Sequence, residues 1–129
     1  MPGSFLLDTN IAVALLVGED AVRAALNQSG LAFLSSVVVG ELFYGARKSA
    51  RREANLARVE ELAARFVVLN CDLSTARYYG KIRDLLRGKG RPIPENDIWI
   101  AAHAQQYDLT LVTRDAHFGA VEGIRVEAW

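Results

Sequence analysis

The chain has few of the features that mark a secreted or membrane protein. Its 129 residues include one cysteine, Cys71, which excludes an internal disulfide and a zinc site made of several cysteines. A single cysteine fits the reducing cytoplasm, where we expect the protein to act. The first residues show no basic segment followed by a long apolar run, so we expect no signal peptide. The apolar run at residues 11–17 is too short to cross a membrane.

The sequence also has no internal repeat, low-complexity tract or linker. A chain of this length is typical of one domain, so we expect a single domain over residues 1–129. With 51% apolar and 23% charged residues, it has the composition of a globular protein that buries its own core.

Charge of either sign is balanced overall but unevenly distributed. Residues 47–91 contain 12 of the 15 lysines and arginines and only 5 of the 15 acids, so the rest of the chain is acidic. Solvated helix faces explain such a pattern without any function. On charge alone we favour that explanation; the alternative is a basic rim beside an acidic cleft, as a metal-dependent enzyme acting on a polyanion needs.

Short apolar runs alternate with segments of helical periodicity, which predicts an α/β protein. Five runs read as strands, at residues 5–7, 31–34, 66–69, 109–113 and, more weakly as a closing edge strand, 124–129. Six segments read as helices, at residues 11–16, 19–28, 37–48, 51–65, 73–86 and 94–104. We expect a three-layer α/β/α sandwich around a mainly parallel sheet of about five strands.

Four acids occupy positions that such a fold brings together. Asp8 ends the first predicted strand, and Asp115 lies just past the fourth. Asp97 is in the first turn of a helix, on its apolar face, and Glu41 lies on the apolar face of helix 37–48. Because ligands of parallel sheets bind beyond the carboxyl ends of the strands, we expect all four carboxylates to meet at one edge of the sheet.

Clustered carboxylates are the preferred ligands of Mg²⁺ and Mn²⁺. Four of them could bind one ion, or two ions, and activate a water for attack on a phosphodiester. We predict Asp8 and Asp97 as the primary ligands. Glu41 and Asp115 would bind a second ion, bind waters or act as a base. Without metal, their repulsion should make one or more of them hold a proton near neutrality.

Four segments in this order resemble the PIN-domain family, in particular its small bacterial VapC-type toxins. They are Leu-Leu-Asp-Thr-Asn at 6–10, Ser-Val-Val-Val-Gly-Glu-Leu at 36–42, Pro-Glu-Asn-Asp-Ile-Trp-Ile-Ala-Ala-His-Ala at 94–104, and Leu-Val-Thr-Arg-Asp-Ala-His-Phe at 111–118. The resemblance spans essentially the whole chain. It implies a parallel sheet flanked by helices and a Mg²⁺- or Mn²⁺-dependent endoribonuclease.

The resemblance also implies which residues form the site and which partners the protein has. The acidic quartet of the family maps onto Asp8, Glu41, Asp97 and Asp115, and its strand-end Ser or Thr maps onto Thr113. Thr9 and Asn10 are placed to bond to the same network. The implied partners are an RNA substrate, an antitoxin whose tail blocks the cleft, and a second copy of the chain in a homodimer. Apolar residues of the first two helices, Leu15, Leu16, Val22 and Leu26, are either core or a groove for an antitoxin helix.

Other polar residues have competing interpretations. Candidates for binding the RNA backbone, a contact that carries little sequence information, are Arg83, Arg87, Lys89, Arg91 and Arg114. Arg114 is equally well explained as a solvated residue at a strand end. His103 lies about 240° around the helix from Asp97, so we predict a surface or interface histidine. His117 is close to the acids, but we favour a turn residue.

Three other functions compete with the nuclease. A phosphohydrolase with Asp8 as nucleophile usually has a second Asp two residues later, where this chain has Asn10. A phospho-acceptor regulatory domain usually pairs two acids near the end of its first strand, and Glu41 inside a helix does not fit that pattern. A non-catalytic α/β binding module with vestigial acids also stays open.

Overall fold

Five parallel strands form one sheet in the computed structural model, which describes residues 3–129. The strands are β1 (Ser4–Leu7), β2 (Leu31–Ser35), β3 (Val67–Leu69), β4 (Thr110–Val112) and β5 (Arg125–Glu127). Their order across the sheet is β3-β2-β1-β4-β5, and every neighbouring pair is parallel. The weak edge-strand pattern near the end of the chain therefore predicted β5 correctly.

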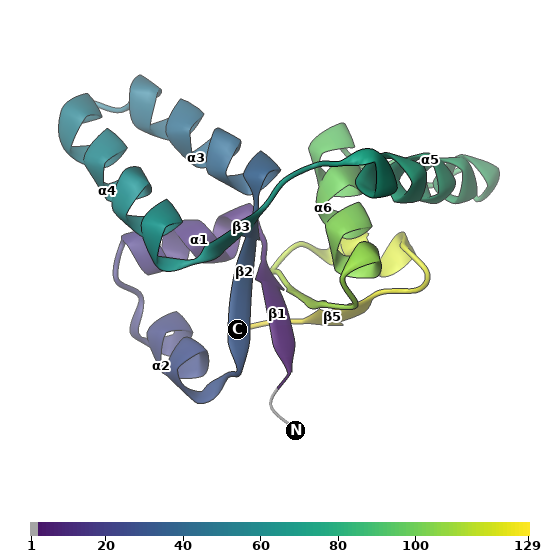
Figure 1. Ribbon diagram of the computed structural model, residues 1–129, viewed down its shortest axis with the longest axis horizontal. Coiled ribbons are helices and arrows are strands. Elements are labelled where there is room, and N and C mark those ends of the chain that lie inside the picture. Colours follow the sequence, from purple (N-terminus) through teal and green to yellow (C-terminus); the bar gives the residue numbers. More distant parts are fainter. Residues whose placement is uncertain (1–2) are drawn as a thin grey trace.

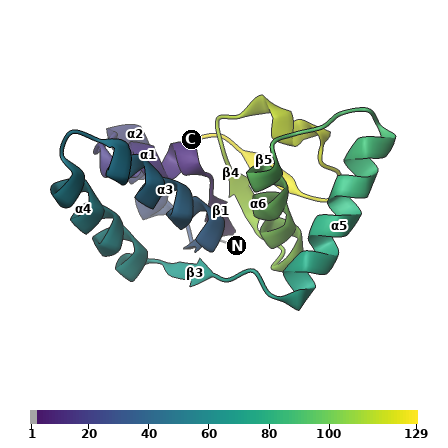
Figure 2. The same cartoon turned by 90° about the horizontal axis from the view of Figure 1, so that it is seen from above.

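Helices cover both faces of this sheet. One layer contains α1 (Thr9–Leu16), α2 (Asp20–Gln28), α3 (Ser36–Lys48) and α4 (Arg52–Arg65), and the other contains α5 (Leu73–Gly88) and α6 (Glu95–Gln106) (Figures 1 and 2). A short 3₁₀ helix, η1 (Ala116–Ala120), joins β4 to β5. This arrangement confirms the predicted three-layer α/β/α sandwich. No helix in residues 3–129 is long and apolar enough to span a membrane.

Helices begin directly at the carboxyl ends of two central strands. The Asp8 side chain follows β1 and caps α1, because it accepts a hydrogen bond from the Thr9 N–H. Ser35 ends β2 and caps α3 through the Val37 N–H at 3.0 Å. These caps place the first turns of α1 and α3 at the same edge of the sheet.

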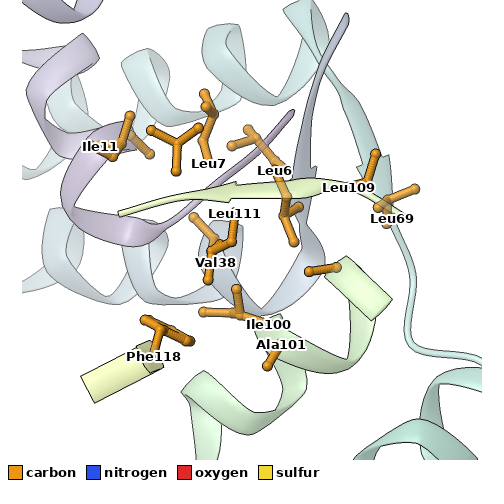
Figure 3. Close-up of a cluster of buried hydrophobic side chains, with 14 of the residues drawn as sticks. Leu6, Leu7, Ile11, Val38, Leu69, Ile100, Ala101, Leu109, Leu111 and Phe118 are labelled. Atoms are coloured by element: carbon orange, nitrogen blue, oxygen red, sulfur yellow. The ribbon is translucent and has the colours of Figure 1, made fainter. Parts of the chain in front are cut away.

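The core lies on both faces of the central strands. Leu6 and Leu7 of β1 and Leu111 of β4 are fully buried, as expected for strands with continuous apolar runs. Figure 3 shows Leu6 and Leu111 near Ile100 of α6, with Phe118 of η1 closing the same cluster. The strand ends are therefore fixed by close packing, which gives the residues that follow them defined positions.

His103 is fully buried, so the prediction of a surface or interface histidine was wrong. The periodicity placed it away from Asp97, but the end of β2 and the residue after β3 lie on that side of α6. Its Nε2 lies 3.1 Å from the Asn70 carbonyl oxygen, and its Nδ1 lies 3.0 Å from Ser35 Oγ. A carbonyl only accepts, so Nε2 carries the hydrogen and the Ser35 hydroxyl donates to Nδ1. Burial lowers the pKa of His103, which keeps the ring neutral.

We expect His103→Ala to lower the free energy of unfolding by about 2–4 kcal/mol, measured by urea denaturation. The substitution opens a cavity and leaves the buried Ser35 hydroxyl without its partner. The exposed Arg77→Ala on α5 is the control and should change stability by less than about 0.5 kcal/mol.

The difference between wild type and His103→Ala should also depend on pH. Since the folded-state pKa of His103 is lowered, only the unfolded chain binds the proton just below about pH 6.5. The contribution of His103 is thus complete above that pH and shrinks as the pH falls. A difference that is constant from pH 7.5 to 5 would contradict the neutral, buried assignment.

Candidate active site

An open cleft of about 620 Å³ lies beyond the carboxyl ends of β1 and β4, at the starts of α1 and α6. All four predicted acids line it: Asp8, Glu41, Asp97 and Asp115. They come from four separate segments of the chain. The structure therefore brings together the whole acidic set that the sequence singled out.

Asp8 is the most buried of the four acids, with 4% of its surface exposed. One carboxylate oxygen accepts from the Thr9 N–H at 2.8 Å, and the other accepts from the Thr113 hydroxyl at 2.6 Å. The same Thr113 oxygen accepts from the Asp115 N–H at 3.0 Å. Thr113 thus orients Asp8 directly and fixes the backbone from which Asp115 extends.

Glu41 reaches the cleft from α3. Its Oε1 accepts from the Thr9 hydroxyl at 3.1 Å. Partial burial raises the pKa of Glu41, the bond from Thr9 opposes this effect, and the charges of Asp97 and Asp8 add to it. This carboxyl group therefore binds a proton more readily than an ordinary glutamate.

His117 joins two of the acids. Its Nε2 lies 2.5 Å from Asp97 Oδ2, and its Nδ1 lies 2.9 Å from Asp115 Oδ1. Burial raises the pKa of Asp97, and the charges of Asp8 and Asp115 add to the effect, although the contact with His117 opposes it. His117 lies in the 3₁₀ helix η1 and not in a simple turn, and its contacts with two acids were missed. The only signal was its position two residues after Asp115.

Asn10 and Arg114 lie at the border of the site. The Arg114 N–H donates to Asn10 Oδ1 at 3.4 Å, which ties the end of β4 to α1. The Arg114 guanidinium pairs with Glu19 and donates to the Trp129 carbonyl at 3.2 Å. The Glu19 carboxylate also raises the pKa of Arg114. Binding a phosphate through this side chain would require the ion pair with Glu19 to open.

In the part of the chain that the structure describes, the basic candidates near the end of α5 do not line the acidic cleft. Lys89 Nζ lies 2.9 Å from Glu122 Oε1 and donates to the Ala120 carbonyl at 3.1 Å, so it ties the loop after α5 to η1. Arg91 is exposed in that loop. Arg83 and Arg87 border a neighbouring cavity instead.

The donor atoms of the cleft fit a hard divalent cation. Asp97, Asp115 and His117 each offer a ligand atom, and these atoms lie within 4.8 Å of one another. The pKa values of Glu41 and Asp97 are raised, chiefly because burial disfavours the ionised carboxylates and also because neighbouring acids repel them. A bound cation would remove that repulsion and favour the ionised carboxylates.

A parallel α/β sandwich with an acidic cleft at its carboxyl edge defines a class of metal-binding α/β proteins. The chain belongs to the PIN-domain family, because the family model described as "PIN domain" matches residues 5–124. The family resemblance drawn from the four sequence segments is thereby confirmed. Nucleases of this family generally depend on divalent metal ions.

Relatives match over nearly the full length of the chain. A protein of Shigella flexneri named "tRNA(fMet)-specific endonuclease VapC" is 41% identical over 128 residues, covering 97% of both chains. "Ribonuclease VapC2" of Haemophilus influenzae is 37% identical over 128 residues with the same coverage. Among solved structures, DNA-bound VapBC from Salmonella typhimurium superposes with a TM-score of 0.92 at 37% identity, covering 98% of both chains.

His117→Ala should weaken Mn²⁺ binding by about 10- to 100-fold in a calorimetric titration. The reason is that Asp97 and Asp115 lose the ring that orients them. His117→Gln keeps a hydrogen-bond donor, so its affinity for Mn²⁺ should lie between those of the wild type and His117→Ala. Unchanged or tighter binding by His117→Ala would mean that the ring only compensates charge.

Asp97→Asn should raise the melting temperature of the metal-free protein, because it replaces a carboxylate whose neutral form the folded state favours. Mn²⁺ at 100 times the Kd of the wild type should raise the free energy of unfolding of the wild type by about 2.7 kcal/mol. At the same Mn²⁺ concentration, Asp97→Asn should gain much less stability. Equal gains in the two proteins would place the ion elsewhere.

Proposed function

We propose that this protein is a Mg²⁺- or Mn²⁺-dependent endoribonuclease, the toxin of a toxin–antitoxin pair, acting in the cytoplasm. The observation that carries the proposal is the meeting of four carboxylates in one open cleft. The relatives named as VapC ribonucleases support it, because they match this chain over nearly its whole length.

Each residue of the cleft has a role in this proposal. Asp8 and Asp97 would hold the ion, with Glu41 and Asp115 completing the site. When bound, the ion supplies Lewis-acid stabilisation of the developing charge and a water of lowered pKa. Thr113 and the Thr9 N–H each hold one oxygen of Asp8, and His117 contacts one oxygen of Asp97 and one of Asp115. Glu41 is suited to accept the proton of the attacking water at its carboxylate, since its pKa is raised toward neutrality.

The geometry disfavours Asp8 as a covalent nucleophile. Both of its oxygens accept hydrogen bonds, and almost none of its surface is exposed. Attack on phosphorus needs an open approach in line with the leaving oxygen, whereas binding a metal ion needs only one free lone pair on a carboxylate oxygen. Hydrolysis by water instead leaves a 5′-phosphate and a 3′-hydroxyl on the RNA.

A groove of about 370 Å³ between α1, α2 and α4 is the proposed antitoxin site. Leu15, Leu16 and Leu26 line it, whereas Val22 is fully buried in the core. Arg23, Arg58 and Arg65 add positive charge around the apolar floor. An amphipathic antitoxin helix with acidic flanks fits such a groove. We further propose that the protein forms a homodimer.

Purified wild type should cut RNA into discrete fragments with Mg²⁺ or Mn²⁺, and a chelator should stop the cleavage. The double variant Asp8→Asn/Asp97→Asn should lose activity by at least about 10²-fold. Asp84→Asn, which neutralises an exposed acid on α5, is the matched control and should keep full activity. Cleavage that survives in the double variant or in chelator would refute the proposal.

A further inference from the structure

A second cavity, of about 430 Å³, adjoins the acidic cleft. It lies between the end of α5, the start of α6 and the loop that joins them, and these two helices lie side by side in Figures 1 and 2. Its floor is apolar, formed by Leu86, Ile93 and Ile98. Arg83 and Arg87 supply positive charge at its rim. An apolar floor with a cationic rim matches a planar base attached to a phosphate.

Glu95 connects the two spaces, because it lines both the cavity and the cleft. Its Oε1 accepts from the Tyr79 hydroxyl at 2.8 Å, and Arg83 donates to that hydroxyl oxygen at 2.6 Å. The Tyr79 ring stacks on Trp99, with 4.1 Å between ring centroids. This assembly holds the Glu95 carboxylate at the boundary. The Arg83 side chain is 63% exposed and keeps further donors directed to solvent.

We propose that this cavity is a nucleoside subsite for the RNA strand whose scissile phosphate lies in the acidic cleft. The inference rests on the proposed nuclease function. Arg83 and Arg87 bind a phosphate next to the scissile one, and the adjoining base rests on the apolar floor. Continuity through Glu95 and the concentration of positive charge in residues 47–91 favour nucleic acid over a protein segment.

Glu95 gives the subsite a preference among bases. A carboxylate accepts hydrogen bonds from amino groups on base edges, such as N4 of cytosine. Guanine and adenine also carry an exocyclic amine, and uracil does not. The subsite therefore favours an amino-bearing base over uracil at the position beside the cut.

The test compares two double variants of α5. Arg83→Ala/Arg87→Ala removes both rim charges, and Arg77→Ala/Lys81→Ala removes the same charge from exposed positions outside this cavity. Binding of a labelled oligoribonucleotide is followed by fluorescence anisotropy from 50 to 200 mM salt. The rim variant should bind at least about tenfold more weakly, and its log–log salt slope should fall by about 0.7 for each phosphate that it no longer neutralises. Equal behaviour of the two variants would overturn the subsite.

Cleavage assays separate this proposal from the nuclease function. Bis(p-nitrophenyl) phosphate has no nucleoside, so the rim variant should hydrolyse it like the wild type while cutting RNA about tenfold less efficiently. Glu95→Gln should narrow the preference for amino-bearing bases over uracil by about tenfold. An unchanged preference would overturn the role of Glu95. If the wild type cleaves neither substrate, the nuclease function fails, and the anisotropy comparison still decides whether the cavity binds RNA.

Discussion

The gathering of four carboxylates in one partly buried cleft is the constraint on which the site depends. Asp8, Glu41, Asp97 and Asp115 come from four segments of the chain and line one space. The protein compensates part of this charge with donors from Thr9, Thr113 and His117. The pKa values of Glu41 and Asp97 nevertheless stay raised, chiefly because burial disfavours their ionised forms and also because the neighbouring acids repel them. The folded chain therefore stores unfavourable electrostatic energy that a cation can relieve, which couples metal binding to stability.

The sheet and the two helical layers hold these like charges close together. Strand β1 delivers Asp8 as the cap of α1, while α3 and α6 carry Glu41 and Asp97 from opposite layers. His103 links the end of β2 and the residue after β3 to α6 through two buried hydrogen bonds. A rigid frame of this kind favours an enzyme over a binding module with vestigial acids, because a binding module gains nothing from holding mutually repelling carboxylates close together.

The sequence patterns that predicted the fold are local, whereas the side-chain contacts that were missed depend on how distant segments pack. Continuous apolar runs identified the strands, and acids at strand ends located Asp8 and Asp115 at one edge of the sheet. The prediction for His103 failed because helical periodicity cannot show that the ends of β2 and β3 cover a second side of α6. The bridging role of His117 and the pairing of Lys89 with Glu122 depend on how the segments after β4 and α5 fold back. The position of His117 two residues after Asp115 is its only local signal, and Lys89 has none.

The most direct test of the central claim is anomalous diffraction from a crystal of the protein soaked in Mn²⁺. Our account predicts a peak in the cleft within coordination distance of carboxylate oxygens of Asp8 and Asp97, and loss of that peak in Asp97→Asn. Binding of Mn²⁺ should coincide with the stability gain expected for a ligand of the folded state. A fully occupied Mn²⁺ site outside the cleft, or an empty cleft at saturating Mn²⁺, would contradict the claim that these four acids form a metal site.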